Sequence, residues 1–292
     1  MLSLPGYVII TPAHNEAAMI GRTLESVVAQ TVQPLRWVIV DDGSTDGTAE
    51  IVRPYVEKYA WIEIITRPRK TGRDFAGKAR AFQEGYASVR DLDAPIIVNL
   101  DADLEFAPDL FEFLLAKFNE NPSLGVWGPV LVEDELQYDY RYSNIQNVAG
   151  PCQMFRRACF DEIGGYSPME GGGIDHLAVV SARMCGWTTQ TFSGKMCIHQ
   201  RVMGTAQRGK LRAKFFMGMK DYSLGNHPLW QASRALYQMT RPPYLIGGFA
   251  LGSGYLWAAA RGRRRVDSKV REFIRREQLK RLRRFVLRGS SS

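Results

Sequence analysis

The stretch Val38-Ile39-Val40-Asp41-Asp42-Gly43-Ser44-Thr45-Asp46-Gly47-Thr48 decides the fold, because its apolar strand pattern stops abruptly at two carboxylates. A second apolar run, Ile96-Ile97-Val98-Asn99-Leu100, ends in the same way at Asp101-Ala102-Asp103. In an open parallel sheet, ligands bind in the crevice at the carboxyl ends of the strands. Carboxylates gathered there repel one another unless a cation or hydrogen-bond donors lie among them. The two stretches therefore predict a divalent metal that holds a diphosphate group.

Apolar runs alternate with helical periodicity around these stretches. We expect strands at Tyr7–Thr11, Trp37–Val40, Trp61–Thr66, Pro95–Leu100 and Leu124–Val132, and helices at Ala17–Gln30, Thr48–Tyr59, Lys78–Val89 and Pro108–Phe118. Such alternation predicts an α/β fold with a doubly wound, mainly parallel sheet. Right-handed crossovers then place the strand ends on one side of the sheet.

Three segments resemble the family 2 glycosyltransferases of GT-A fold. They are Ile10–Glu16, Asp41–Asp46 and Asp101–Asp103, and with later matches the resemblance covers residues 5–205. The resemblance implies an inverting enzyme that moves one sugar from a nucleotide-sugar donor to an acceptor. It also implies a domain at 1–205, with a nucleotide-binding half at 1–103 and a donor-sugar and acceptor half at 104–205.

The resemblance also assigns residues to the nucleotide-sugar pocket. These are Pro12, His14, Glu16, Asp41, Asp42, Lys78 and Asp101. His14 stands where the family usually has tyrosine, which leaves the base undecided. Lys78 could meet a phosphate as a point charge, but a solvated surface lysine is an equal alternative.

A metal site follows from the same resemblance. Asp101 and Asp103 would share one face of an extended segment. Asp103 would ligate Mg²⁺ or Mn²⁺, and Asp101 would contact the ribose or a metal-bound water. His199, in Lys195-Met196-Cys197-Ile198-His199, lies where GT-A enzymes often place a histidine near the metal. Its imidazole suits either ion as a supplement to carboxylates.

The catalytic base of an inverting transfer is a carboxylate that removes the proton of the acceptor hydroxyl. In the family it is an aspartate at the start of a helix, and Asp175 stands in that position. The sequence departs from the family by having Ile174 before it and His176 after it. His176 is therefore an alternative base or an acceptor contact, and a simple helix cap is the alternative for Asp175.

The glycine-rich stretch 133–175 includes Gly171-Gly172-Gly173, which indicates either close approach to a ligand or an ordinary solvent loop. Within it, Asn147–Arg157 resembles the loop that lines the donor-sugar pocket. The chain has four cysteines, none in a C-x-x-C pair, and no recognisable export signal. We therefore expect reduced thiols and a cytoplasmic catalytic domain.

The net charge of +8 is concentrated at one end of the chain. Residues 261–292 contain thirteen Lys and Arg and three acidic residues, a local charge of +10. A helical, basic, membrane-associating region is therefore predicted at 206–292. Tyr244–Ala260 is apolar and near the lower length limit for crossing a bilayer, and Ser268–Arg288 has the composition of a basic, partly amphipathic helix.

An anionic membrane surface is the partner that this tail favours, with peripheral or single-anchor attachment at the inner face of the cell membrane. Nucleic acid is the rival partner and is not expected beside glycosyltransferase motifs. A buried helix of a soluble domain is the alternative for Tyr244–Ala260. The acceptor would be lipid-linked or a saccharide, in the assembly of a cell-surface polysaccharide or glycolipid.

Two other functions remain open. A nucleotidyltransferase also uses carboxylates at strand ends with a metal, but it normally has a Gly-rich phosphate loop near its start, which Pro12–Glu16 is not. A non-catalytic module that binds sugar nucleotides or lipids is the other. Processive synthases of the family carry Gln-x-x-Arg-Trp, whereas this chain has Gln231-Ala232-Ser233-Arg234-Ala235. The difference favours single addition.

Overall fold

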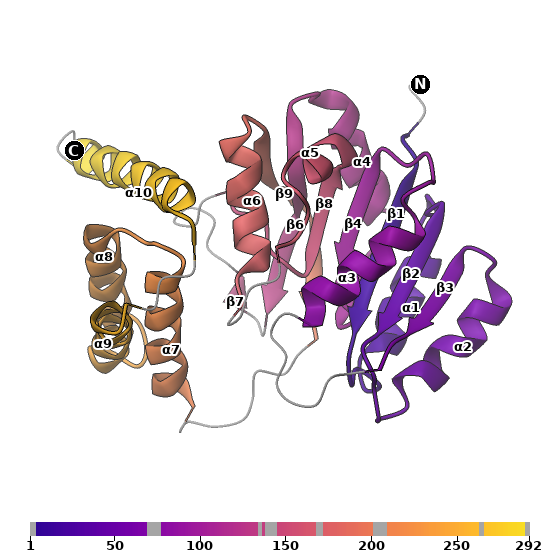
Figure 1. Ribbon diagram of the computed structural model, residues 1–292, viewed down its shortest axis with the longest axis horizontal. Coiled ribbons are helices and arrows are strands. Elements are labelled where there is room, and N and C mark those ends of the chain that lie inside the picture. The colour runs from indigo at the N-terminus through magenta and orange to yellow at the C-terminus, as the bar shows by residue number, and fades with distance from the viewer. Residues whose placement is uncertain are drawn as a thin grey trace. The chain divides into compact units, whose positions relative to one another are not determined.

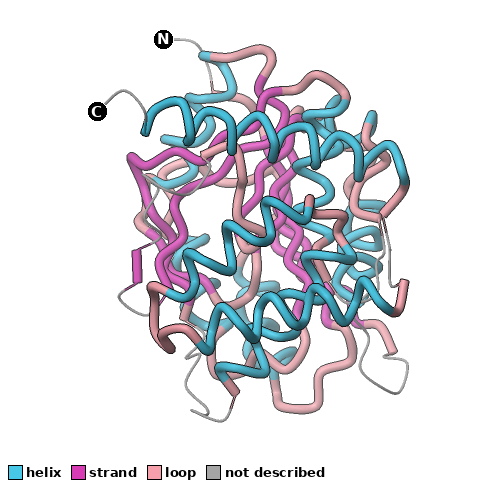
Figure 2. The backbone as a smooth tube through the Cα atoms, turned by 90° about the vertical axis from the view of Figure 1, so that its left-hand side faces the viewer, coloured by secondary structure: helices cyan, strands magenta, loops and turns pink. Residues whose placement is uncertain are grey.

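The chain forms two compact units in the computed structural model, which describes residues 4–68, 77–133, 136–137, 145–167, 172–200, 209–262 and 266–289. One unit comprises Met1–Glu170 with Ile174–Met203, and the other comprises Gly171–Gly173 with Gly204–Ser292. Within the described residues the first unit holds every strand and the second is helical (Figures 1 and 2). The predicted boundary between residues 205 and 206 lies outside the described residues.

Among the described residues, nine strands form one sheet in the order β3-β2-β1-β4-β8-β6-β9-β5, with β7 paired to β6. The strands are β1 (Tyr7–Ala13), β2 (Arg36–Asp41), β3 (Ile62–Thr66), β4 (Ile96–Leu100), β5 (Leu104–Phe106), β6 (Leu124–Glu133), β7 (Leu136–Gln137), β8 (Cys152–Arg156) and β9 (Thr188–His199). Pairing is parallel from β3 to β4, which confirms the doubly wound α/β fold. Beyond β4 the sheet is mixed, because β8 runs antiparallel to both β4 and β6.

Helices cover both faces of this sheet. They are α1 (Ile20–Val28), α2 (Thr48–Lys58), α3 (Gly77–Ser88), α4 (Leu110–Glu120), α5 (Arg157–Glu162) and α6 (Ile174–Met184). Figure 1 shows α3, α5 and α6 in front of the sheet, with α1 and α4 behind it. The strands are therefore buried on both sides, which explains why their sequences are nearly continuous apolar runs.

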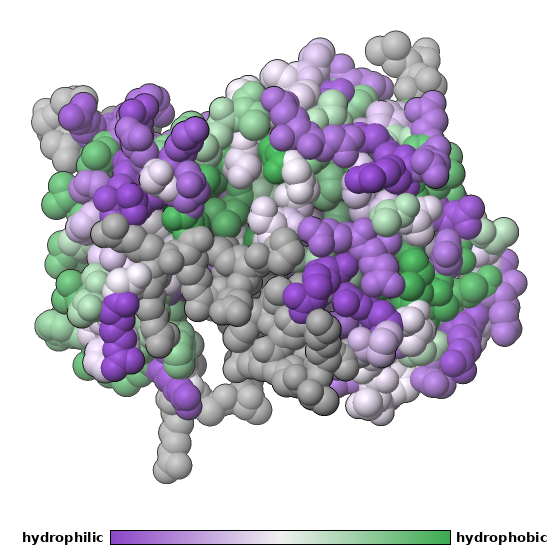
Figure 3. All heavy atoms as spheres, in the orientation of Figure 1, coloured by the Kyte–Doolittle hydropathy of each residue, from purple (hydrophilic) through white to green (hydrophobic). Residues whose placement is uncertain are grey.

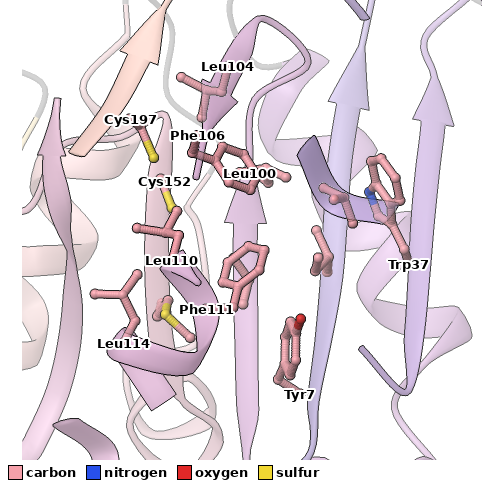
Figure 4. Close-up of a cluster of buried hydrophobic side chains, with 14 of the residues drawn as sticks. Tyr7, Trp37, Leu100, Leu104, Phe106, Leu110, Phe111, Leu114, Cys152 and Cys197 are labelled. Atoms are coloured by element: carbon pink, nitrogen blue, oxygen red, sulfur yellow. The ribbon is translucent and has the colours of Figure 1, made fainter. Parts of the chain in front are cut away.

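The main core lies between the sheet and the layer of α1, α2 and α4. Figure 4 shows Leu110, Phe111 and Leu114 of α4 in the same layer as Tyr7 of β1 and Trp37 of β2, with the ring centroids of Phe111 and Tyr7 5.1 Å apart. The polar atom of each of the two buried aromatic side chains Tyr7 and Trp37 forms a hydrogen bond within the protein. The Trp37 indole donates to Thr11 Oγ1 over 2.9 Å, and the Tyr7 hydroxyl donates to the Val32 carbonyl over 2.6 Å.

A second cluster of aromatic rings packs on the opposite face of the sheet. The Phe82 ring of α3 meets Tyr166 edge to face at a centroid distance of 4.9 Å, and Phe155 of β8 meets Phe160 of α5 at 5.1 Å. Edge-to-face pairs of this kind add about 0.5–1.5 kcal/mol each to the free energy of unfolding beyond simple burial. The sheet is thus packed on both faces, by aliphatic and aromatic side chains on one and by this aromatic cluster on the other.

The second unit contains four helices among the described residues. They are α7 (Lys210–Ser223), α8 (Pro228–Met239), α9 (Ile246–Ala260) and α10 (Ser268–Gly289). Glycines allow α7 and α9 to approach closely, since a Cβ at Gly218 would collide with the Leu251 carbonyl and one at Gly254 with the Phe215 carbonyl. Tyr222 and Tyr255 stack edge to face beside this crossing.

The crossing of α7 and α9 gives a stability prediction. Gly254→Ala should lower the free energy of unfolding by about 1–3 kcal/mol, because the added methyl group forces the two backbones apart. Gly252→Ala is the matched control in the same helix, since its nearest neighbour would be Ala235 Cβ at 4.0 Å. The control should be neutral or stabilise the protein by about 0.5–1 kcal/mol. Urea unfolding of both variants checks this, and equal losses would contradict the packing.

Two sequence predictions concern the cysteines and the apolar run. All four cysteines are free thiols, as predicted; Cys152, Cys159 and Cys197 are buried, and Cys185 is exposed. The apolar run forms α9, which begins at Ile246 and not at Tyr244 because Leu245 has a φ of 56°. Within the described part of the chain, none of the helices has both the length and the apolar character needed to cross a membrane.

Candidate active site

The strand order brings the predicted site residues to one edge of the sheet. The chain runs from β1 to β2 and β3 on one side, and then returns to place β4 on the other side of β1. The parallel strands β1, β2 and β4 therefore end at the same edge of the sheet. The strand order reverses between β1 and β4, and α/β proteins bind ligands at such a switch point. The last residues of these strands and the loops that follow them hold Pro12–Glu16, Asp41–Asp42 and Asp101–Asp103.

A pocket of about 300 Å³ opens at this point. Most of the predicted residues are part of its wall, which consists of Pro12, Ala13, His14, Glu16, Asp42, Lys78, Ala81, Asp101, Ala102, Asp103 and His199. Asp41, Asp175 and His176 lie outside this wall. The three alanines of the wall leave room for a ligand, and nothing in the sequence marks them as residues of a site. Four carboxylates against one ammonium group give the wall a surplus of negative charge, which favours a bound cation.

The first two loops are fastened to each other by side-chain hydrogen bonds. The backbone N–H groups of Asn15 and Glu16 donate to Ser44 Oγ and Thr48 Oγ1 over 3.0 and 2.9 Å. Ala17 donates to Asp46 Oδ2 over 2.9 Å. These bonds hold residues 15–17 in the loop, which explains why α1 begins at Ile20 and not at the predicted Ala17. They also fix the β1 loop as one wall of the pocket.

Asp103 and His199 meet because β5 pairs with β9. In that antiparallel register Leu104 lies opposite His199, and the Gln200 N–H donates to the Asp103 carbonyl over 2.9 Å. The His199 Nε2 and Asp103 Oδ2 atoms are consequently 3.0 Å apart, with both side chains largely buried. The structure thus places the two predicted metal ligands side by side.

This pair fits a divalent cation. Two ligand atoms at adjacent corners of an octahedral Mg²⁺ or Mn²⁺, each roughly 2.1 Å from the ion, are about 3.0 Å apart. Among the described residues, no group of three or more His, Cys, Asp and Glu side chains could hold a metal ion. Two protein ligands are sufficient, since such ions usually complete their shell with phosphate oxygens and water.

Lys78, at the start of α3, lies beside Asp101 with its Nζ 2.5 Å from Oδ1. Burial alone would lower the pKa of Lys78, but the attraction of Asp101, Asp175 and Asp103 raises it above its ordinary value. The ammonium group therefore stays charged. It is positioned to meet an anionic group in the pocket, although it is ion-paired in this structure.

Arg67 is a residue of the site that the sequence analysis missed. It follows β3 directly, and its Nε lies 3.4 Å from Asp42 Oδ1 and 3.4 Å from Glu84 Oε2. The backbone N–H of Arg67 also donates to the Asp41 carbonyl over 3.0 Å. The signal was available, because a charged residue that ends a parallel strand belongs to the same edge of the sheet as the predicted carboxylates.

Asp175 lies in the first turn of α6 and is half-buried. Gly150 approaches it so closely that a Cβ there would be 2.6 Å from Asp175 Oδ2. Asn99 Nδ2 holds this glycine by donating to its carbonyl over 2.7 Å. Burial raises the pKa of Tyr166, and the charge of Asp175 raises it further. The same charge acts with that of Asp101 to raise the pKa of Lys78 in the pocket wall. His176 is half-buried in the same turn.

A pocket with several carboxylates at the ends of parallel strands is typical of α/β proteins that bind a ligand together with a cation. Comparison with known proteins identifies the family. The model of the family described as glycosyl transferase family 2 matches residues 8–168. The chain belongs to this family. The resemblance inferred from the three sequence segments is thereby confirmed.

The relatives in the curated proteins are similar over part of their length. A probable glycosyltransferase, YdaM, of Bacillus subtilis is 35% identical over 35% of this chain and 24% of the relative. Chondroitin synthase of Pasteurella multocida is 31% identical over 41% of this chain and 12% of the synthase. The chain thus spans a quarter or less of the length of these two relatives.

Solved structures share the fold across most of the chain. The mannosyltransferase PcManGT from Pyrobaculum calidifontis, in complex with GDP-Man and Mn²⁺, is 21% identical, with a TM-score of 0.58 over 89% of this chain and 76% of that one. Staphylococcus aureus TarS 1–349 with UDP-GlcNAc is 15% identical, with a TM-score of 0.54 over 86% of this chain and 71% of that one. The GT-A fold is therefore confirmed.

Proposed function

We propose that the chain is a metal-dependent, inverting glycosyltransferase that moves one sugar from a nucleotide-sugar donor to a saccharide or lipid-linked acceptor. The observation that carries this proposal is the contact of Asp103 with His199 inside the pocket at the ends of β1, β2 and β4. Family membership and neighbours solved with GDP-Man or UDP-GlcNAc support it. Cell-surface polysaccharide or glycolipid assembly at the inner face of the membrane is the proposed context.

The donor would lie along the pocket wall. Pro12, His14, Glu16, Asp41 and Asp42 would bind the nucleoside. Lys78 would bind the diphosphate, and Asp101 would contact the ribose or a metal-bound water. Asp103 and His199 would hold Mg²⁺ or Mn²⁺, which when bound neutralises charge on the departing diphosphate. Neighbours were solved with Mn²⁺, which supports a divalent ion without choosing between the two.

Asp175 is the proposed catalytic base. Its carboxylate would take the proton of the acceptor hydroxyl as that oxygen attacks the anomeric carbon. The new carbon–oxygen bond forms on the face opposite the diphosphate, whose bond to the same carbon breaks, so the configuration inverts. Its half-buried place in the first turn of α6, with its charge felt at Lys78, supports this role. His176, the next residue, is the alternative base.

The close approach of Gly150 to Asp175 gives a prediction. Gly150→Ala should displace the carboxylate, because the new methyl group would be 2.9 Å from Asp175 Cβ. A displacement of roughly 1 Å costs about 100-fold in transfer rate, and overpacking costs about 1–3 kcal/mol of unfolding free energy. Gly21→Ala in α1 is the control, since nothing lies within 4 Å of its Cβ. Initial rates that are equal in the two variants would count against the assignment of Asp175.

The polysaccharide synthase relatives raise the question of repeated addition. We favour single addition because the corresponding segment departs from the processive motif. Arg234 is ion-paired with Asp221 of α7, with an Nη1–Oδ2 distance of 2.6 Å, and Gln231 is buried. Alanine stands at position 235 where the motif has tryptophan. A ladder of products longer than one added sugar would refute single addition.

The proposed function is tested most directly by a thermal-shift screen of UDP-, GDP- and dTDP-sugars with and without Mn²⁺. A ligand that binds only the native state at about 100 times its Kd adds about 2.7 kcal/mol to the unfolding free energy. We expect one nucleotide class to stabilise the protein and to require the metal. Absence of a shift with every donor would contradict the proposal. A nucleotidyltransferase would respond to nucleoside triphosphates instead.

A further inference from the structure

Large apolar side chains are exposed on two adjoining helices of the second unit. We call this set the apolar face; it consists of Leu229, Leu236 and Tyr237 of α8, the turn residues Tyr244 and Leu245, and Ile246, Phe249, Leu256 and Trp257 of α9. Phe249 and Leu256 are 66% and 68% exposed. Figure 3 shows green over α8 and α9 and purple over α10. Apolar patches of this kind mark sites of interaction.

The inner side of α9 is already packed. A Cβ at Gly248 would collide with the Ala235 carbonyl of α8, and one at Gly254 with Phe215 of α7. The outer side repeats at helical spacing through Ile246, Phe249 and Leu256, and the helix contains no charged residue. A helix that is apolar all round is expected to have an apolar environment on both sides. Helices α7 and α8 cover the inner side of α9, and its outer side is exposed.

Charged groups border the apolar face in a way that fits lipid headgroups. The Arg261 guanidinium lies over the Trp257 ring at 4.0 Å from its centroid, and Arg241 lies over Tyr237 at 5.3 Å. Both pairs stand at the C-terminal ends of their helices. Trp, Tyr and Arg with apolar bodies and polar tips are typical of the boundary between acyl chains and headgroups. Helix α10 adds nine Lys and Arg against two Glu.

We infer that the apolar face inserts into one leaflet of an anionic membrane, with α9 lying along the surface. Helix α7, which packs along α9, carries Lys214, Lys220 and Asp221. A crossing orientation of α9 would carry these charges into the hydrocarbon, where each is strongly disfavoured. An interfacial orientation leaves them in water and places Arg241 and Arg261, which border the apolar face, near anionic headgroups. The inference does not depend on the transfer reaction.

Vesicle flotation of the full chain tests this inference. Wild-type protein should float with vesicles of phosphatidylcholine and phosphatidylglycerol, more weakly but still measurably at about 0.5 M salt, because only the electrostatic part is screened. Phe249→Asp/Leu256→Asp should reduce partitioning at least about 30-fold, since two inserted side chains are lost. The control Leu35→Asp/Ile145→Asp alters two exposed apolar residues of the first unit with the same change in charge. It should bind as wild type does.

Two further measurements are the depth of Trp257 in the membrane and the oligomeric state of the protein. Brominated acyl chains should quench the fluorescence of Trp257, with Trp257→Phe as the subtraction control. Wild-type protein that stays out of the floating fraction at low and high salt overturns the inference, as does equal flotation of the Phe249→Asp/Leu256→Asp variant. A wild-type dimer that this variant converts to a monomer, with no vesicle binding by either, would assign the apolar face to a second copy. Unchanged nucleotide binding by the variant separates this outcome from failure of the proposed function.

Discussion

Asp103→Asn is expected to abolish metal-dependent donor binding and to lower the transfer rate by at least about 1,000-fold. The Asp103 side chain is 4% exposed and contacts His199, so it would be the main anionic ligand of the ion. A neutral amide is a far poorer partner for a hard divalent cation, and several kcal/mol of charge stabilisation are at stake. Each 1.36 kcal/mol corresponds to a factor of ten in rate.

The measurement is calorimetric titration of Mn²⁺ with a nucleoside diphosphate, together with initial transfer rates. Asp109→Asn is the matched control, because Asp109 is a carboxylate of the same unit that pairs with Lys195 at 2.5 Å outside the pocket wall. It should bind metal and donor normally. Both variants should keep the fold, since asparagine retains the shape of aspartate. Full activity of Asp103→Asn, or of the wild type in EDTA, would refute the metal site.

Much of the first unit could be predicted from its sequence, because local patterns determine it. The parallel strands from β3 to β4 are short apolar runs, and their lengths and order follow from the alternation with helices. The gathering of Glu16, Asp42 and Asp101 at one edge follows from the same alternation. The helix start at Ile20 could not be predicted, since it depends on bonds from residues 15–17 to a loop distant in sequence.

The mixed half of the sheet depends on contacts that periodicity does not reveal. Cys152–Arg156 resembles part of a sugar-pocket loop in sequence, yet residues 152–156 form the buried strand β8 beside β4. The contact of His199 with Asp103 spans ninety-six positions and exists because β5 and β9 pair. From the sequence, His199 could be predicted as a metal ligand only through the family resemblance. The apolar run of α9 could likewise be recognised from the sequence. The close packing of its glycines against α7 and α8, which distinguishes α9 from a lone membrane-spanning helix, could not.

Asp175→Asn is expected to bind donor with unchanged affinity and to transfer sugar about 100- to 10,000-fold more slowly. The amide cannot accept the proton of the acceptor hydroxyl, and general-base catalysis contributes about that factor. Asp175 lies outside the pocket wall, so the contacts with nucleotide and metal should persist. The prediction is thus a loss confined to kcat, which distinguishes a base from a donor ligand. Saturation kinetics in donor and acceptor, with a separate Kd for the donor, measure it.

His176→Ala decides between the two neighbouring candidates for the base. If Asp175 is the base, His176→Ala should lose less than about tenfold in kcat, since the carboxylate remains in the first turn of α6. If His176→Ala instead loses transfer while Asp175→Asn retains it, the histidine takes the proton and Asp175 only stabilises the first turn of α6. Asp109→Asn again controls for the chemical change itself. A variant that damages the fold should have both a lower donor affinity and a lower melting temperature. A variant that loses only the proton acceptor should leave both of these values unchanged.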